Sequence, residues 1–232
     1  MSLRRELGLL HATMMGLGST ICAGIFVILS PAIEIAGPAV ILSFLLCGII
    51  NMATMLSYCE LGAAMPRVGG EYAYAKAAFK GFPGFLTGWY EWSSNIFYAT
   101  LMALGSAYML SYIMPINKFL IIIILVIVLT AINIKGIKEA GTTQTLLTSI
   151  LLAIIFLFVG AGFAYGFRSK AFEPFMPKGP LSVIVAIAFI FETYVGVEAI
   201  AAAQAEIKEP KKTIPRAMIL CSLILIIVYC LV

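Results

Sequence analysis

The chain has 232 residues, of which 62% are hydrophobic and 11% charged, and its mean hydropathy is +1.06. This composition excludes an ordinary soluble domain and indicates an integral membrane protein. The net charge of +4 is modest, and its placement argues for membrane orientation and not for nucleic acid as a partner. The five cysteines lie in or beside apolar runs at no regular spacing, which predicts packing residues and neither a disulfide framework nor a thiolate metal site.

Apolar runs predict six crossings of the lipid bilayer and the start of a seventh. The first run, Leu7 to Ile33, is too long for a signal peptide and lacks a cleavage pattern. The second, Ala36 to Cys59, exceeds the ~20 residues that a helix needs to cross the hydrocarbon. The polar connection after it, which holds Tyr72 and Tyr74, predicts a short helix at the membrane interface. The remaining crossings are expected at about Pro83–Tyr112, Phe119–Ile134, Thr143–Phe167 and Leu181–Ala205.

The seventh apolar run is shorter than the others. It extends from Ala217 to Val232, which is 16 residues, and it ends without a charge or an interfacial anchor. This length falls short of a comfortable crossing. We therefore expect the chain to be truncated at its C-terminus, with further C-terminal helices of the same protein as its missing partners.

The distribution of lysine and arginine predicts the orientation. If the N-terminus is cytoplasmic, alternating connections place 11 of these residues inside and 4 outside. Because cytoplasmic loops carry an excess of Lys and Arg, we expect a multi-pass protein of the cell membrane with its N-terminus in the cytoplasm. The inside set is Arg4, Arg5, Arg67, Lys76, Lys80, Lys135, Lys138, Lys208, Lys211, Lys212 and Arg216, and the outside set is Lys118, Arg168, Lys170 and Lys178.

One stretch in the first crossing departs from a plain membrane helix. The run from Gly18 to Phe26, GSTICAGIF, gathers two glycines, two hydroxyls and two other small residues where lipid offers no hydrogen-bond partner. Either neighbouring helices pack closely here, or the helix opens. An opened helix would expose N–H groups on one side of the gap and C=O groups on the other, and such a gap can hold a carboxylate and an ammonium group.

The sixth crossing also departs from a plain membrane helix, because it carries Glu192 and Glu198 on either side of Gly196. A carboxylate inside the bilayer costs roughly 3 kcal/mol on insertion scales, so it is usually paired, protonated or turned toward a polar cavity. Interruptions in the first and sixth crossings are what an inverted five-helix repeat would produce, with a site between the two breaks. The alternative for Glu198 is a structural contact between the sixth helix and a polar neighbour.

Three classes of function compete at this point. A transporter accounts for both interrupted crossings and for the intramembrane carboxylates with a single site. A membrane enzyme would need a nucleophile with a base or a metal cluster, and a chain with one histidine, no aspartate and neither HExxH nor GxSxG leaves little to build one from. A structural or inactive membrane subunit is the third alternative.

Several motifs together resemble those of the amino acid, polyamine and organocation (APC) transporter superfamily, over essentially the whole chain. They are GSTICAGIF at 18–26, PRVGGEY at 66–72, and YVGVE at 194–198 followed by EIKEPKKTIPR at 206–216. The resemblance implies an all-α membrane protein with the LeuT-type inverted-repeat fold, of which this chain holds helices 1 to 6 plus an incomplete helix 7. It implies a single transmembrane domain over 1–232, with the first repeat at about 7–167 and the second starting within about 181–232.

The resemblance also implies a function: secondary active transport of amino acids or related amines by alternating access, with the substrate at the breaks of helices 1 and 6. Carried over by position, the substrate carboxylate would lie on backbone N–H groups of residues 22–24. The substrate amine would lie against carbonyls near Thr20, Glu192 and Val195. The implied substrate-binding residues are Ser19, Thr20, Ile21, Cys22, Ala23, Gly24, Asn95, Glu192, Val195 and Gly196.

Some residues depart from the pattern of the superfamily. Cys22 and Ala23 stand where many relatives carry glycine or serine, which preserves backbone recognition and removes a hydroxyl contact. Glu192 stands where relatives often carry an aromatic gate, which suggests a cationic substrate or a titrating gate, so Glu192 and Glu198 are the gating or coupling candidates. The resemblance implies no cofactor, and it leaves open a proton or sodium as coupling ion, the choice among uniport, exchange and symport, and a non-transporting fragment.

Overall fold

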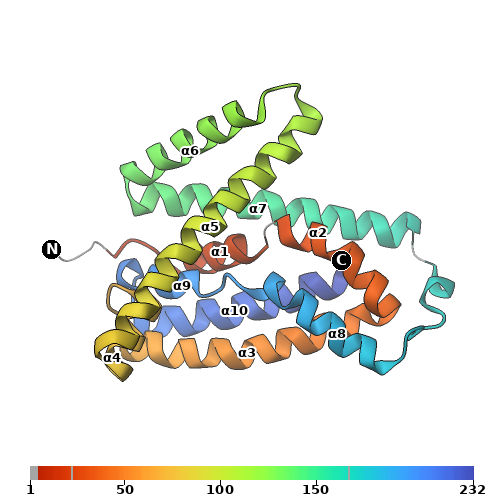
Figure 1. Cartoon of the computed structure of the whole chain (residues 1–232), viewed down its shortest axis with the longest axis horizontal. Helices are drawn as coiled ribbons and strands as arrows, with labels where there is room; N and C mark the ends of the chain where they lie inside the picture. Colours follow the sequence, from red (N-terminus) through yellow and green to blue (C-terminus); the bar gives the residue numbers. More distant parts are fainter. Residues whose placement is uncertain (1–4, 22, 167) are drawn as a thin grey trace.

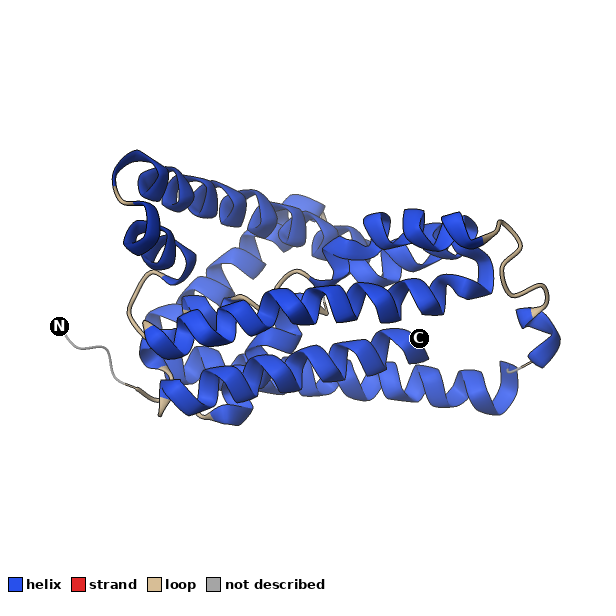
Figure 2. Cartoon of the chain, turned by 90° about the horizontal axis from the view of Figure 1, so that it is seen from below, coloured by secondary structure: helices blue, strands red, loops and turns tan. Residues whose placement is uncertain are grey.

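The computed structural model describes residues 5–21, 23–166 and 168–232, and these ranges fold into a bundle of helices (Figure 2). The all-α class is confirmed. The α-helices are α1 (Leu9–Thr20), α2 (Ala23–Ala36), α3 (Val40–Ala64), α4 (Gly70–Phe79), α5 (Gly81–Ile113), α6 (Lys118–Lys135), α7 (Ile137–Ala161), α8 (Pro180–Ile190), α9 (Ala199–Ala202) and α10 (Pro210–Leu231). The short 3₁₀ and π segments are η1 (Gly37–Ala39), η2 (Gly162–Gly166), η3 (Ser169–Phe172), η4 (Phe191–Tyr194) and η5 (Gln204–Glu206).

Within the described ranges, six helical stretches are long and apolar enough to cross a membrane, which makes this a multi-pass membrane protein. The first stretch, Ile28–Ala64, joins the last part of the first expected crossing to the second, and the other five correspond to the third through seventh. The first expected crossing is described as two helices, α1 and α2. The short helix expected in the polar connection is α4, which is 10 residues long and holds Tyr72 and Tyr74.

The seventh crossing is longer than expected. It was expected to start at Ala217, but α10 begins at Pro210 and continues for 22 residues, enough to cross the hydrocarbon. The physical reason is that Pro210 occupies the first helical turn, where a missing N–H costs nothing and the fixed φ of proline favours the helix. Lys211, Lys212 and Arg216 therefore lie on the first turns of the helix and not in a loop before it.

The core of the bundle lies between α3 and α10, which pack along each other, with α1 and α8 against them (Figure 1). Its largest fully buried side chains include Phe44, Tyr194 and Tyr229. These rings pack together, with centroid distances of 5.0 Å between Tyr194 and Tyr229 and 5.7 Å between Phe44 and Tyr229. The side chains of α5 and α6 are mostly exposed and apolar, as expected of helices that face lipid, whose tails solvate them.

Close packing of α1 against α7 involves Gly18. A Cβ atom at this position would lie 2.1 Å from Nε2 of Gln144 and 2.2 Å from Oγ1 of Thr148. Thr148 also donates a hydrogen bond from its hydroxyl to the Met14 carbonyl. The stretch from Gly18 to Phe26 was expected either to pack closely or to open, and it does both at different residues. Gly18 lies within α1 and allows close packing, and the helix opens after Thr20.

We expect Gly18→Ala to lower the thermal stability of the purified protein, by about 1–3 kcal/mol, because the added methyl group must displace the side chains that α7 places there. Gly105→Ala on α5 is the matched control, because nothing lies within 4 Å of its Cβ position. It should leave stability unchanged or raise it by up to about 1 kcal/mol, since alanine favours helix more than glycine does. Thermal unfolding in detergent checks both, and equal melting of the two variants would contradict the packing role of Gly18.

The segment before α1 is attached to the segment that follows α9. The N–H groups of Glu6 and Leu7 donate to the Glu206 carbonyl at 2.9 and 3.1 Å, and the Lys208 N–H donates to the Leu7 carbonyl at 2.8 Å. Leu7 and Ile207 form an isolated parallel bridge, and both side chains are buried. The start of the first interrupted helix and the end of the sixth are thus joined by backbone hydrogen bonds.

Candidate functional site

The first helix is interrupted after Thr20, as the sequence predicts. Ile21 leaves the helical region at φ −78° and ψ 71°, and α2 begins at Ala23. The Ser19 carbonyl, at the open end of α1, accepts a hydrogen bond from the Tyr98 hydroxyl at 3.2 Å. Cys22 lies outside the described residues, so the expectations for it stay predictions.

The sixth helix is interrupted between α8 and α9, also as predicted. After η4 the backbone of Val195 is extended, at φ −75° and ψ 134°, and Gly196 has φ +135°. Glycine adopts this positive φ without the steric cost that a Cβ atom would bring. The Gly196 N–H donates to Oε2 of Glu198 at 2.9 Å, so this carboxylate satisfies a backbone group that the break leaves free.

The two breaks are in contact. A Cβ atom on Gly196 would lie 2.7 Å from the Ser19 carbonyl oxygen and 2.7 Å from Oγ1 of Thr20, so only glycine allows this approach. Tyr229 of α10 bridges the breaks: its hydroxyl donates to the Thr193 carbonyl at 2.7 Å and lies 3.4 Å from the Thr20 carbonyl oxygen. Residues almost 180 positions apart in the chain therefore form one site.

A cavity of about 360 Å³ lies beside the two breaks. Six of the predicted site residues line it: Ser19, Asn95, Glu192, Val195, Gly196 and Glu198. The side chains of Thr20 and Ile21 are buried in the helix packing and are not among the lining residues that the structure describes. Ala23 and Gly24 form the first turn of α2, where N–H groups have no intrahelical partner.

The structure adds residues to the cavity that sequence reasoning did not assign to a site. Glu71 comes from α4, Glu91 and Tyr98 from α5, and Tyr58 from α3. Glu71 lies in the PRVGGEY motif and Glu91 is the one charge of its crossing, so both are visible in the sequence, but neither was predicted to be a site residue. Four glutamates thus line the cavity, and no lysine, arginine or histidine is found among its described lining residues.

Glu71 lies outside the membrane-spanning helices and is half-buried. Burial raises its pKa from an ordinary value of 4.5 to about 7, the charges of Glu91 and Glu198 add to the rise, and hydrogen bonds from its own N–H and from Tyr58 oppose it. Close to neutral pH, this side chain is therefore present in both protonation states. The cavity charge consequently changes within the physiological pH range.

We expect this shift to make stability depend on pH. The folded protein binds the Glu71 proton more tightly than the unfolded chain does, so the protonated form stabilises the fold below pH 4.5, and this stabilisation is lost as pH rises through about 7. After solvent screening, the effect is on the order of 1 kcal/mol. Thermal unfolding from pH 5 to 8 should show it, and Glu71→Gln should reduce the slope. Glu60→Gln, an exposed change on α3, is the control, and equal slopes in both variants would contradict the prediction.

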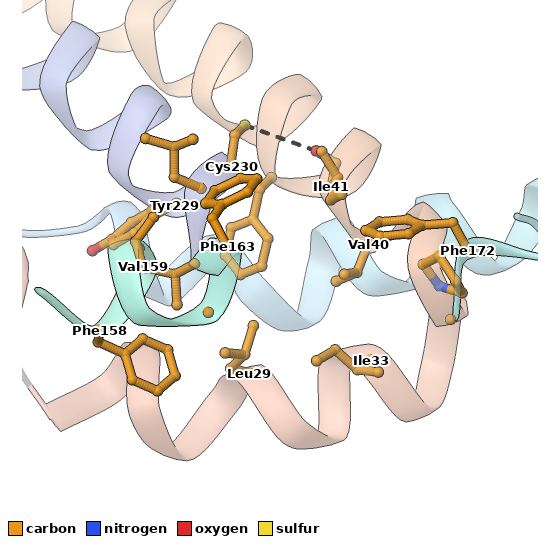
Figure 3. Close-up of a pocket in the computed structure, with 16 residues that line it drawn as sticks. Leu29, Ile33, Val40, Ile41, Phe158, Val159, Phe163, Phe172, Tyr229 and Cys230 are labelled. Atoms are coloured by element: carbon orange, nitrogen blue, oxygen red, sulfur yellow. Dashed lines mark hydrogen bonds between the residues drawn. The ribbon is translucent and has the colours of Figure 1, made fainter. Parts of the chain in front are cut away.

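A larger cavity, of about 520 Å³, lies toward the end of the bundle away from α4, between α2, α3, α7 and α10. Figure 3 shows its apolar lining, including Leu29, Val40 and Phe163, and the Cys230 thiol, which donates weakly to the Ile41 carbonyl. Tyr229 lines this cavity too, although its hydroxyl is bonded at the breaks. An apolar lining gives a charged solute no partner, so the smaller cavity is the candidate site.

Comparison with known proteins identifies the family. Residues 11–232 match the family model for amino acid permeases. The chain is 31% identical, over 99% of its length, to an uncharacterized transporter of Mycobacterium tuberculosis, and covers 52% of that protein. It is 30% identical, over 94% of its length, to the methylthioribose transporter of Bacillus subtilis, and covers 51% of that protein. It is 26% identical, over 98% of its length, to the branched-chain amino acid permease BcaP of Bacillus subtilis, and covers 53% of that protein.

The chain thus spans about half the length of the curated relatives it matches. The family and these relatives are transporters and not enzymes, which removes the membrane-enzyme alternative. The family match extends over almost the whole chain, including both interrupted helices and the cavity between them. On this evidence the chain belongs to the amino acid permease family of the APC superfamily.

Proposed function

We propose that the protein is a secondary active transporter of amino acids or related amines and holds its substrate at the breaks of the first and sixth helices. The observation that carries this proposal is the contact between Gly196 and the open end of α1 at Ser19, beside a cavity lined by carboxylates. Two interrupted helices that meet within a membrane protein bring together, away from lipid, backbone N–H and C=O groups that lie outside the regular hydrogen-bond pattern of a helix. A zwitterion needs both kinds of group.

The proposed fold is the LeuT type, with a single transmembrane domain in which the first five-helix repeat covers about 7–167 and the second begins within about 181–232. The interruption of helices 1 and 6, each the first of its repeat, supports it. The sixth helix also packs on the core formed by α3 and α10, so both breaks lie inside the bundle.

In this proposal the substrate carboxylate binds N–H groups of residues 22–24, at the start of α2, where the helix dipole favours a negative charge. The ammonium group binds carbonyls on the facing ends, near Thr20, Glu192 and Val195. Asn95 contributes from α5, where its amide donates to Oε1 of Glu91 at 3.1 Å and so faces the same acidic cavity.

The cavity extends from the breaks to Glu71 and Ala202, which lie toward the end of the bundle that carries α4 and the N-terminal segment (Figure 1). Glu192 and Glu198 are the gating or coupling groups of the proposal, with a proton or sodium as the coupling ion.

Reconstitution tests the proposed function. Proteoliposomes loaded with a mixture of amino acids and amines should take up a labelled member of that mixture by counterflow, and Gly24→Val should abolish uptake, because a branched side chain at the start of α2 blocks the backbone groups. If the reconstituted protein moves none of these solutes, while it is folded by its melting curve, a structural or inactive membrane subunit becomes the better interpretation. Imposed proton and sodium gradients then distinguish symport from exchange.

A further inference from the structure

A cavity of about 310 Å³, here called the basic cavity, lies apart from the candidate substrate site. Its lining comes from the segment before α1, the connection between α3 and α4, and the start of α10, and consists of Arg5, Pro66, Glu209, Pro210, Lys211 and Lys212. None of them is among the described lining residues of the substrate cavity. The volume is at the lower end of the range for small-molecule sites. The basic cavity is therefore a separate feature that the proposed transport does not use.

The basic cavity carries more positive than negative charge. Arg5, Lys211 and Lys212 are exposed cations, and Glu209 is the single carboxylate of the lining. Its Oε2 atom lies 3.7 Å from Nζ of Lys212, and this is the one ion pair that the described ranges contain. Within those ranges, Arg5 and Lys211 have no carboxylate partner. Because arginine and lysine are the side chains that bind phosphate groups, a phosphate between them would supply the missing negative charge.

The place of the cavity along α10 puts it at the height of lipid headgroups. α10 begins at Pro210, and its uninterrupted apolar part starts at Ala217, so Lys211 lies six residues before the hydrocarbon boundary. Six residues of helix are about 9 Å long. The headgroup layer on each side of a bilayer is roughly 5–8 Å thick, and long basic side chains extend into it from its outer edge. The phosphates nearest to this cavity are therefore those of membrane lipids.

Other side chains at the same end of the bundle also suit a lipid surface. Val68, Phe79 and Phe82, on either side of and at the end of α4, are each more than two-thirds exposed. Lys76 and Lys80 are exposed beside them. Exposed apolar side chains next to lysines are typical of a surface that lies in the membrane interface, where the cations meet phosphates and the apolar groups meet acyl chains. This end of the molecule thus fits a lipid headgroup better than a soluble anion.

We infer that the basic cavity binds the phosphodiester headgroup of an anionic membrane lipid, between Arg5 and the start of α10. The inference goes beyond the proposed transport function and does not depend on it. Arg5 lies two residues before Leu7, whose backbone is paired with the segment that leads into α10. A headgroup bound to both sides of the cavity would hold this joint together, so the bound lipid should also raise the melting temperature of the protein.

Binding of short-chain lipids to the purified protein in an uncharged detergent tests this inference. The probes are dihexanoyl phosphatidylglycerol, dihexanoyl phosphatidylcholine and inorganic phosphate. The two lipids have the same acyl chains and differ in the net charge of the headgroup. Isothermal titration should show that phosphatidylglycerol binds about tenfold or more tightly than phosphatidylcholine, and also more tightly than inorganic phosphate, which has no acyl chains to place it at the membrane surface.

Two triple variants separate the cavity from a diffuse attraction of lipid to basic residues. In R5Q/K211Q/K212Q the ratio of the two lipid affinities should fall close to one. The matched control is K80Q/K135Q/K138Q, which removes the same amount of charge from exposed lysines at the same end of the bundle but outside the cavity. It should keep the wild-type ratio and the rise in melting temperature with phosphatidylglycerol.

Three results would overturn the inference. One is equal affinity of the wild-type protein for the two lipids. Another is an equal loss of preference in both triple variants, which would assign the effect to general surface charge. The third is inorganic phosphate binding as tightly as phosphatidylglycerol, which would make the cavity a site for a soluble anion. If R5Q/K211Q/K212Q does not fold, Arg5→Gln alone, at a residue outside every helix, should lower the preference about threefold, and an unchanged preference would again overturn the inference.

Discussion

Replacing Gly196 by alanine is expected to lower substrate binding and transport at least a hundredfold and to destabilise the fold by about 1–3 kcal/mol from backbone strain alone. The residue has φ +135°, which an L-amino acid with a Cβ atom rarely adopts. The new methyl group would also lie 2.7 Å from the Ser19 carbonyl oxygen, a backbone atom that moves only if α1 moves. The two breaks would be pushed apart at the point where the substrate is proposed to bind.

Gly160→Ala and Gly105→Ala are the matched controls for this change, because no atom lies within 4 Å of either Cβ position and neither glycine has a positive φ. Binding should be measured by isothermal titration with the amino acids and amines of the counterflow mixture, transport by counterflow, and stability by thermal unfolding. A Gly196→Ala protein that binds and melts like the wild type would show that the contact between the breaks is dispensable.

The second large effect is expected from Tyr229→Phe. The change keeps the ring, which packs on Tyr194 and Phe44, and removes only the hydroxyl. The Thr193 carbonyl then loses its hydrogen-bond donor, the Tyr229 hydroxyl. Thr193 is 2% exposed, so water does not replace the hydroxyl, and the unpaired carbonyl lowers the free energy of unfolding by about 1–3 kcal/mol. Since the hydroxyl also lies beside the Thr20 carbonyl, we expect the breaks to separate and substrate binding to weaken about tenfold.

Tyr112→Phe is the control for Tyr229→Phe, because the side chain at this position is 88% exposed. It should leave both melting and binding at wild-type values. Unaltered binding in Tyr229→Phe, together with a lower melting temperature, would assign Tyr229 to core stability alone and remove it from the substrate site.

Most of the architecture could be predicted from hydropathy, because the bilayer imposes helix length and forbids unpaired backbone. The break in the sixth helix was predictable for the same reason, because a glycine between two glutamates is unfavourable in an unbroken membrane helix. The predicted start of the seventh crossing, at Ala217, was wrong, because charged residues such as Lys211 and Lys212 were assigned to a loop. A proline at the first helical position lets α10 begin before them.

From the residues alone, the site was predictable only where the sequence shows an anomaly: Glu192 and Glu198 are carboxylates in an apolar run, and they do line the cavity. Asn95 was implied by the resemblance to the superfamily, and it lines the cavity too. Tyr58 and Glu71 follow ordinary interfacial patterns, so their place in the cavity arises from the packing of α3 and α4, which local sequence does not encode. The approach of Gly196 to Ser19 is likewise a property of tertiary structure, although each glycine-rich break was visible separately.

The backbone pairing of Leu7 with Ile207 and Lys208 has a mechanical meaning for the proposed cycle. It couples the segment before α1 to the segment after α9, so neither segment can move without displacing the other. A displacement of either segment would thereby be transmitted to the other break through main-chain hydrogen bonds, which do not depend on the side chains of the paired residues.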